Sequence, residues 1–463
     1  MAKENISGML EIATLKHEVE NGNIDTILTV FPDMYGRLVG KRITSHFFLD
    51  HVSGQGMHAC DYLLACDMEM DPVPGYKFSS WETGYGDFSV VPDMATLRRA
   101  SWLPKAAMVM CDLYSADGEK VVEIAPRRIL QKQIDRARSM GFEPMAGSEL
   151  EFFIFKETLD SAKEKNYLKL QTFGWYIEDY HILQGTKEED LVGRIRNCMD
   201  ESGVPVEFSK GEWGPGQHEI NLKYSDFMEM ADRHSIYKHA AKEIAFQKEL
   251  SITFMAKWDE KLAGSSMHLH VSLWDELKKE NQFKGTHKIG PVKGSDVFRW
   301  FLGGWMYHAQ EIAIFYAPNV NSYKRYQAGS FAPTKIAWSY DNRTAGFRIV
   351  GKENTLRIEC RIPGADANPY LAFAATLAAG LDGIDNKIEP PDVFTGNVYL
   401  AKDLPEVPNN LRDAIKILEK SKFAHKAFGN EVVDHYLHFF SIEQSKFDQV
   451  VTNWERERFF ERI

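Results

Sequence analysis

Four segments combine the alternation of β-strands with an unusual set of polar side chains. They are SELEFFIF (148–155), GSSMHLHVSLW (264–274), LRIECRIP (356–363) and EWGPGQHEINLKY (212–224). Because side chains alternate across a strand, the first three predict strands with one apolar and one polar face. Their polar residues are Glu149 and Glu151; His268, His270 and Ser272; and Arg357, Glu359 and Arg361. The fourth segment places Glu212 and Glu219 at either end of a Gly-Pro turn.

The residue types on these faces favour a binding site over a solvated surface. For one strand alone, a solvent-facing polar side is the simpler interpretation, but such positions usually carry Thr, Lys and mixed polar residues. Carboxylates gathered together repel one another and raise each other's pKa, and Mg²⁺ or Mn²⁺ relieves that repulsion. Arginines suit bidentate binding of phosphate or carboxylate. Together these groups indicate phosphoryl transfer from a metal-bound nucleotide.

A basic loop separates two of these strands. The stretch NVNSYKRYQAGSFAP (319–333) holds two adjacent cations, and no Asp or Glu occurs between Glu311 and Asp341, although the net charge of the chain is −11. Such a loop fits a small anion, because local cations can lie inside an acidic shell. The segment GFRIVGKE (346–353) is spaced like a P-loop, but it ends in Glu353 where Ser or Thr would bind Mg²⁺.

Length and composition set the outer limits. A chain of 463 residues exceeds the usual size of one core, so we expect two domains, residues 1–118 and 119–463. The acidic balance argues against nucleic acid as a partner. No apolar run approaches the roughly 20 residues of a membrane span. The five cysteines are odd in number and scattered, which argues against a disulfide framework. The N-terminus MAKENIS has no basic-then-apolar signal, so we expect a cytoplasmic protein.

Local signals place several elements. Residues 24–31 and 38–44 flank PDMYGR and predict a hairpin. Residues 126–140 predict a helix, and the Ala-rich stretch Tyr370 to Leu381 predicts a buried one. The pattern Ser441-x-x-Gln444 resembles a capping box and predicts the start of the last helix.

Taken in order, these motifs resemble the glutamine synthetase family. The matching segments are Glu149–Phe153, Glu212–Glu219, Met267–His270, Asn321–Arg325, DNRTAGFRI with Arg343 and Arg348, and Arg357–Arg361. The resemblance covers most of the chain, from the hairpin to PGADANPYL. It implies an α+β protein with an N-terminal β-grasp domain and a larger catalytic domain with a strand-lined cavity. It also implies a ring, expected to be a dodecamer, in which a neighbouring subunit completes each active site.

The resemblance also implies roles for single residues. Glu151, Glu212 and Glu219 would hold one Mg²⁺ or Mn²⁺, and Glu149, His268 and Glu359 a second. Arg325 and Arg361, with backbone near Gly264, would bind glutamate. Arg343, Arg348 and Arg357 would face the phosphates of ATP. Tyr224 and Ser272 would lie near adenine and ribose, and His270 fits either the nucleotide side or a structural role. Asp87 matches a family aspartate at the substrate site.

One position departs from the family. Ammonia-using members carry a flap glutamate six residues after the loop arginine, where this chain has Phe331, and the Asp-Gly-Ser-Ser loop is also missing. We therefore expect an ATP-dependent ligase that joins the γ-carboxylate of glutamate to an organic primary amine. The candidates are an alkylamine, an arylamine, ethanolamine or a polyamine, with a monoamine favoured. The alternatives are an authentic glutamine synthetase, a non-catalytic homologue, and a glutamate–cysteine-type ligase.

Overall fold

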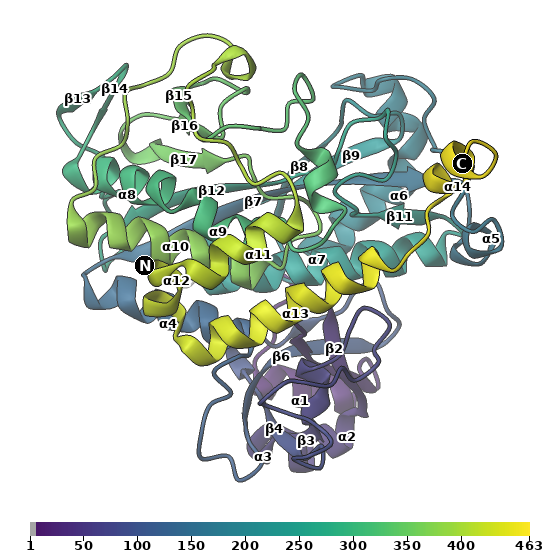
Figure 1. Ribbon diagram of the computed structural model, residues 1–463. Helices are drawn as coiled ribbons and strands as arrows, with labels where there is room; N and C mark the ends of the chain where they lie inside the picture. Colours follow the sequence, from purple (N-terminus) through teal and green to yellow (C-terminus); the bar gives the residue numbers. More distant parts are fainter. Residues whose placement is uncertain (1–5) are drawn as a thin grey trace.

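The computed structural model describes residues 6–463. The N-terminal part of the chain forms a small sheet (Figure 1). Six strands form it in the order β2-β1-β6-β4-β3, with β5 beside β6. They are β1 (Thr26–Pro32), β2 (Leu38–Thr44), β3 (Met57–Cys60), β4 (Asp87–Pro92), β5 (Arg98–Arg99) and β6 (Ala106–Ser115). The predicted hairpin is confirmed, since β1 and β2 pair antiparallel from Thr26↔Thr44 onward. Its turn is fixed by Asp33, whose carboxylate accepts the N–H groups of Tyr35 and Arg37.

The second sheet contains all four of the segments with polar faces. Its path is β15-β16-β17-β12-β7-β9-β8, and the short strands β10 and β11 also pair with β7. Its strands are β7 (Glu143–Phe155), β8 (Val206–Gly211), β9 (Gln217–Leu222), β10 (Ser225–Asp226), β11 (Ser251–Thr253), β12 (Met267–Trp274), β15 (Trp338–Tyr340), β16 (Phe347–Val350) and β17 (Arg357–Cys360). The P-loop-like segment is therefore an ordinary strand, β16, as its bulky residues indicate.

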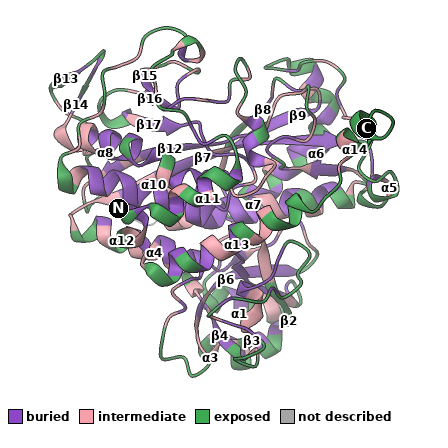
Figure 2. Ribbon diagram, viewed as in Figure 1, coloured by how far each residue is buried: buried purple, intermediate pink, exposed green. Residues whose placement is uncertain are grey.

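Helices pack against this sheet and around it (Figure 1). Those used below are α4 (Pro126–Ser139), α6 (Ile182–Asp200), α7 (Phe227–Gln247), α10 (Pro369–Asn386), α13 (Asn430–Asp448) and α14 (Asn453–Phe459). Helices α4 and α7 contact β7, and α10 packs on α4, α7 and α8 (Asp296–Tyr307). The predicted helix after Pro126 and the buried helix after Tyr370 are both confirmed. The buried positions run through the central strands and the helices that face them (Figure 2).

The predicted start of the last helix at Ser441 is wrong. Helix α13 runs without a break from Asn430 to Asp448, and its buried residues include Phe439 and Phe440, which precede the supposed cap. Burial of that apolar face outweighs a local capping signal. The last helix, α14, begins instead after Thr452, which forms a capping box with Glu455.

The arrangement is α+β, as predicted: the six-stranded sheet lies in the N-terminal part of the chain, and the nine-stranded sheet and a two-stranded sheet of β13 (His287–Ile289) and β14 (Val292–Gly294) lie in the rest. A continuous hydrophobic core joins the two halves, and it includes Phe31 of the small sheet and Phe152 of the large one. The division at residue 118 stays a prediction. Over residues 6–463, no helix combines the length and apolar character needed to cross a membrane.

Candidate active site

Two adjoining hollows open over the large sheet. One has a volume of about 550 Å³ and the other of about 480 Å³, and both are lined in part by Glu149 and Asn221. Because they share these residues, they form two halves of one cleft. The first hollow contains these predicted site residues: Glu149, Glu151, Glu212, Glu219, Gly264, His268, Arg325, Phe331, Arg343, Arg348, Glu359 and Arg361. The second contains Tyr224, His270, Ser272 and Arg357.

Strand register brings the first carboxylate group together. Glu151 on β7 lies opposite Glu219 on β9, and one oxygen from each of Glu151, Glu212 and Glu219 lies within 4.8 Å of the others. Burial raises the pKa of Glu151 to about 7, and the charge of Glu212 adds to this shift. The pKa of Glu219 is also raised, by burial and then by Glu149 and Glu212. Glu151 and Glu219 are thus poorly compensated in the absence of a cation, whereas Glu212 is paired with Lys210.

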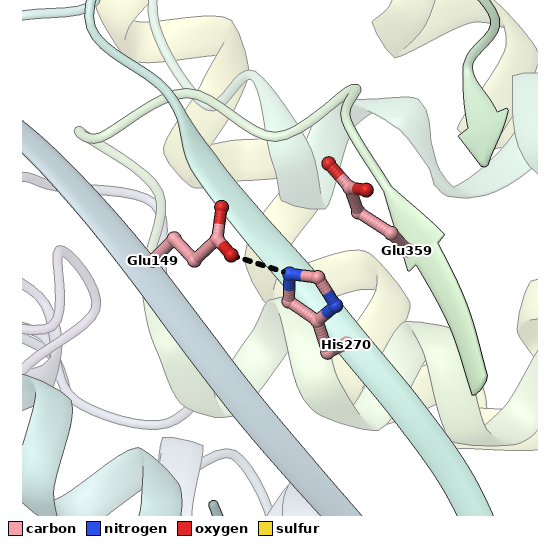
Figure 3. Close-up of side chains that lie close together, drawn as sticks. All are labelled: Glu149, His270 and Glu359. Carbon is pink, nitrogen blue, oxygen red and sulfur yellow. Dashed lines mark hydrogen bonds and ion pairs between the residues drawn. The ribbon is translucent and has the colours of Figure 1, made fainter. Parts of the chain in front are cut away.

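The second group surrounds Glu149, which lies opposite His268 in the register of β7 and β12. The Nδ1 atom of His268 is 3.1 Å from Glu149 Oε2 and 3.9 Å from Glu359 Oε1. His270 points toward the same carboxylate, with Nε2 2.8 Å from Glu149 Oε1 (Figure 3). Although burial opposes it, the charge of His270 and hydrogen bonds from both histidines hold the pKa of Glu149 well below its ordinary value.

His270 thus connects the two hollows. Its other ring nitrogen accepts a hydrogen bond from Arg357 Nε at 3.1 Å, and ligand atoms of Glu149, His270 and Glu359 also lie within 4.8 Å of one another. Both histidines are therefore within reach of the second group, although the motifs assigned only His268 to it and gave His270 to the nucleotide side or to a structural role. Carboxylate oxygens with an imidazole nitrogen suit Mg²⁺ or Mn²⁺, so the donor chemistry of both groups fits the predicted ions.

Arginines also line the first hollow. Arg348 and Arg361 each donate to the buried carboxylate of Glu359 at 2.6 Å. Although burial opposes the shift, Arg361 and the nearby histidines lower the pKa of Glu359 to about 2. The Nε atoms of Arg325 and Arg361 are buried and have no hydrogen-bond partner among the described residues. Each of these two arginines retains a donor for an anion in the cleft.

Arg325 is held in place by backbone groups. Its Nη2 donates to the carbonyl oxygens of Arg361, Ile362 and Pro363 at 3.0, 2.8 and 2.6 Å. Gly264 makes this position possible, because a Cβ there would lie 2.5 Å from Arg325 Cγ and 2.6 Å from the carbonyl oxygen of Ala256.

Phe331 lies on the wall of the first hollow with its side chain 45% exposed. Its ring meets that of Trp213 edge to face, with the centroids 5.7 Å apart. Its backbone has φ +60°, a conformation that bulky residues seldom adopt. The ring at this position therefore borders the cavity rather than a hydrophobic core.

The residues of this hollow that sequence analysis did not single out include Asp179, Tyr180, Lys210 and Trp213. The Nζ atom of Lys210 contacts Glu212 and lies 4.7 Å from the centre of the Tyr180 ring. The N–H of Asp179 donates to the carbonyl of Glu212 at 3.0 Å, which draws this exposed loop to the site. A loop-to-turn contact of this kind leaves no signal in strand alternation.

One predicted site residue lies outside the cleft. Asp87 is an exposed residue of β4 in the small sheet, and it lines neither hollow. A role at the substrate site would require the small sheet of a second copy of the chain. The roles assigned to Asp87 and to the other predicted residues stay predictions.

Comparisons with known proteins agree with this geometry. A gamma-glutamylethanolamide synthetase from Streptomyces coelicolor is 46% identical over 98% of this chain and 96% of that protein. A glutamate–isopropylamine ligase from a Pseudomonas species is 35% identical over the full length of both proteins. A glutamine synthetase from Thermotoga maritima is 32% identical over 97% of this chain and 99% of its own.

A solved structure, that of apo GmaS, has the same fold. It superposes with a TM-score of 0.83 at 27% identity, covering 96% of this chain and 99% of that one. Residues 123–459 match the family described as glutamine synthetase, catalytic domain. The fold and the family expected from the motifs are thus confirmed: the chain belongs to the glutamine synthetase family.

Proposed function

We propose that this protein is an ATP-dependent ligase that joins the γ-carboxylate of glutamate to an organic primary amine. The observation that carries the proposal is the ring of Phe331 on the cavity wall, at the position where the family's ammonia users are expected to have a carboxylate. An apolar ring cannot accept the proton that ammonium must lose, but it can pack against the carbon atoms of an alkyl or aryl amine.

The chemistry requires two steps. A free carboxylate has no adequate leaving group, so a γ-carboxylate oxygen first attacks the terminal phosphorus of ATP and releases ADP. The amine nitrogen then attacks the carbonyl carbon of γ-glutamyl phosphate, phosphate leaves, and the nitrogen loses a proton. Exclusion of water protects the acyl phosphate between the two steps.

The arginines that line the two hollows suit the negative charges of glutamate and of the ATP phosphates. The free Nε donors of Arg325 and Arg361 would bind the carboxylates of glutamate. Arg343 and Arg348 line the first hollow, and Arg357 lines the second, where they would face the phosphates as charge develops. Divalent ions held by the two carboxylate groups would neutralise phosphate charge and orient the transferred group.

The second hollow has the character of a nucleotide-base site. It combines Tyr224 and Ser272 with apolar residues such as Leu222, and Arg357 also lines it. Tyr224 is exposed toward the cavity, so its ring is free to stack on adenine. ATP placed across the shared residue Glu149 would direct its phosphates toward the arginines.

The amine would enter between Phe331, Trp213 and Asp179. The two rings offer apolar contact, and Asp179 offers a carboxylate to receive the proton that the amine must lose. One relative is named for a gamma-glutamylethanolamide product and another for ligation of glutamate to isopropylamine, and both names point to small monoamines. Among the described residues of this hollow, the acids other than Asp179 belong to the two metal groups, which favours a monoamine over a polyamine.

Assembly into a ring is part of the same proposal. In it the small sheet of a neighbouring subunit, with Asp87, would cover the cleft. The second candidate function, glutamine synthesis from ammonia, is favoured by Asp179, because ammonium must transfer a proton to a base and the Asp179 carboxylate could accept it. The Phe331–Trp213 wall does not serve that reaction.

Phosphate release tests the proposal. The purified protein is given ATP, Mg²⁺ or Mn²⁺ and glutamate, together with ammonium, isopropylamine, ethanolamine, aniline or putrescine in parallel. We expect the highest kcat/KM for one of the organic monoamines, with the γ-glutamylamide identified by mass spectrometry. A higher kcat/KM for ammonium than for every organic amine would overturn the proposal.

A further inference from the structure

A third cluster of ligand-type side chains lies behind the cleft, outside the two groups already described. It consists of Glu178 in the loop before α6, Glu188 on α6 and His218 on β9. The exposed fractions of these residues are 1%, 2% and 2%, so the cluster is sealed from solvent. None of the three lines either hollow of the candidate active site.

The two carboxylates are arranged alike. Glu178 Oε1 accepts the N–H of Gly216 at 2.8 Å, and Glu188 Oε1 accepts Nε2 of Gln184 at 3.3 Å. The second oxygen of each faces the same imidazole nitrogen: His218 Nε2 is 3.1 Å from Glu178 Oε2 and in contact with Glu188 Oε2. In each carboxylate one oxygen is thus fixed by a protein N–H donor and the other is directed at the imidazole, an arrangement typical of residues that support a metal.

The converging atoms are not satisfied by hydrogen bonds. Glu178 Oε2, Glu188 Oε2 and both ring nitrogens of His218 are buried without a hydrogen-bond partner of acceptable geometry. Within residues 6–463, the ion pairs of the two carboxylates are both with His218, and no Lys or Arg pairs with them. The charge of Lys187 acts on both carboxyls only from a distance, so two buried carboxyls facing one imidazole remain poorly compensated, which is costly in a protein interior.

The backbone is packed closely around Glu178. A Cβ on Gly211 would lie 2.7 Å from Glu178 Cβ, and one on Gly174 would collide with the Glu178 carboxylate. These two glycines allow the chain to enclose the cluster, so the position of the carboxylate is built into the fold.

We propose that Glu178, Glu188 and His218 form a separate structural site for one divalent cation, Zn²⁺ or Mn²⁺. Two carboxylates with one imidazole is a donor set that both metals accept. The ion would connect α6 to β9 behind the turn that joins Glu212 to Glu219. That turn is already attached to the cluster by the Gly216 N–H. The proposal does not depend on which reaction the cleft catalyses.

Metal content of the full-length protein tests the site. Wild type and variants are loaded with Zn²⁺ or Mn²⁺ alone, dialysed against a weak chelator, and measured by mass spectrometry of the metal per protomer. We expect Glu188→Gln to hold one ion fewer than wild type. Glu189→Gln is the matched control, because Glu189 is an exposed neighbour on the same helix that pairs with Arg196, and it should lose none.

A double variant separates this site from the cleft. Glu151→Gln removes a ligand of the first carboxylate group, and Glu151→Gln with Glu188→Gln should lose the sum of the two single losses. Thermal melting adds a second readout. Zn²⁺ or Mn²⁺ should raise the Tm of Glu151→Gln, and this shift should be smaller in the double variant, in which only the group around Glu149 remains.

The opposite results are equally clear. Equal metal content in wild type, Glu188→Gln and His218→Gln would overturn the proposal and show that the cluster shares protons instead. In chelator, Glu188→Gln should melt no lower than wild type, because it removes one of two buried like charges. His218→Gln is the replacement variant if Glu188→Gln does not fold.

Discussion

The stability of the fold does not explain why a phenylalanine occupies position 331. Its φ of +60° is costly for a bulky side chain, on the order of 1–3 kcal/mol for a residue held in a sparsely populated region. Its ring is 45% exposed and packs edge to face on Trp213, which is itself half-exposed. A strained, exposed ring on a cavity wall gains little from burial, which favours a role in choosing the substrate.

Replacing that ring by an acid should move the enzyme toward ammonium. For Phe331→Glu we expect the ratio of kcat/KM for ammonium to that for the best organic amine to rise about 10- to 100-fold. This range corresponds to the discrimination of about 1–3 kcal/mol that one apolar contact supplies. Phe331→Ala is the control, since it removes the ring without adding a charge. An unchanged ratio in Phe331→Glu would contradict a role for this residue in amine choice.

Asp179 provides a second test at the residue scale. If it receives the amine proton, Asp179→Asn should lower kcat with every amine by about 10²-fold, the lower end of what a positioned base contributes. ADP formation from ATP and glutamate without amine should persist, because the first step needs no base. Asp190→Asn is the control, since Asp190 is an exposed residue of α6 that pairs with Lys248. Equal losses in both variants would rule out the assignment.

At the scale of strands, the candidate site follows from register. Period-two alternation in the sequence placed Glu149 and Glu151 on one face, and pairing then set Glu149 opposite His268 and Glu151 opposite Glu219. The face of each residue could be predicted because it depends on one strand. The pairing could not, because it depends on which strands become neighbours, and it brings His270 as well as the predicted ligand His268 to Glu149.

Contacts made by loops and by helix packing could not be predicted from local sequence patterns. Asp179 reaches the cleft through a backbone hydrogen bond to Glu212, 33 positions along the chain from it. The cap predicted at Ser441 failed because α13 is held by buried residues that directly precede the local motif, among them Tyr436, Phe439 and Phe440. In both cases tertiary contacts decided the outcome, and sequence separation concealed them.

The raised pKa values of Glu151 on β7 and Glu219 on β9 predict that the binding of a metal ion releases protons. Burial and Glu212 raise the pKa of Glu151 to about 7, so near neutral pH the metal-free protein holds a proton that Mn²⁺ must displace. A raised pKa makes the affinity for Mn²⁺ increase as pH rises through about 7, with release of on the order of one proton per ion.

Calorimetric titration with Mn²⁺ in buffers of different ionisation enthalpy measures this release. Glu151→Gln should weaken binding and reduce the released protons, whereas Glu189→Gln should change neither. Affinity that is independent of pH between about 6 and 8 would show that these carboxyls are already ionised in the metal-free protein.

At the scale of the whole molecule, one buried arginine joins the two halves. Arg127, near the start of α4, donates to Asp112 of β6 at 2.6 Å and to Asp93 at 3.0 Å, both in the N-terminal part of the chain. It also donates to Asp232 of α7 at 2.8 Å, and that carboxylate accepts the hydroxyl of Tyr370 on α10. The small sheet is thereby fixed to the helices that pack behind the large one.

Removal of this arginine should therefore destabilise the molecule as a unit. In Arg127→Leu the fully buried Asp232 keeps its charge without a partner, and breaking a buried pair in this way costs about 3–5 kcal/mol. Arg128→Leu is the matched control one position along α4. Its pair with Glu123 is partly exposed, and such pairs contribute about 0–1 kcal/mol.

Urea unfolding followed by fluorescence and by circular dichroism distinguishes the possible outcomes. If Arg127 couples the halves, Arg127→Leu should either lower a single shared midpoint or split the transition so that the small sheet unfolds first. Arg128→Leu should leave the transition close to that of wild type. Equal midpoints for the two variants would mean that the shared apolar core, which includes Phe31 and Phe152, holds the halves together without this ion cluster.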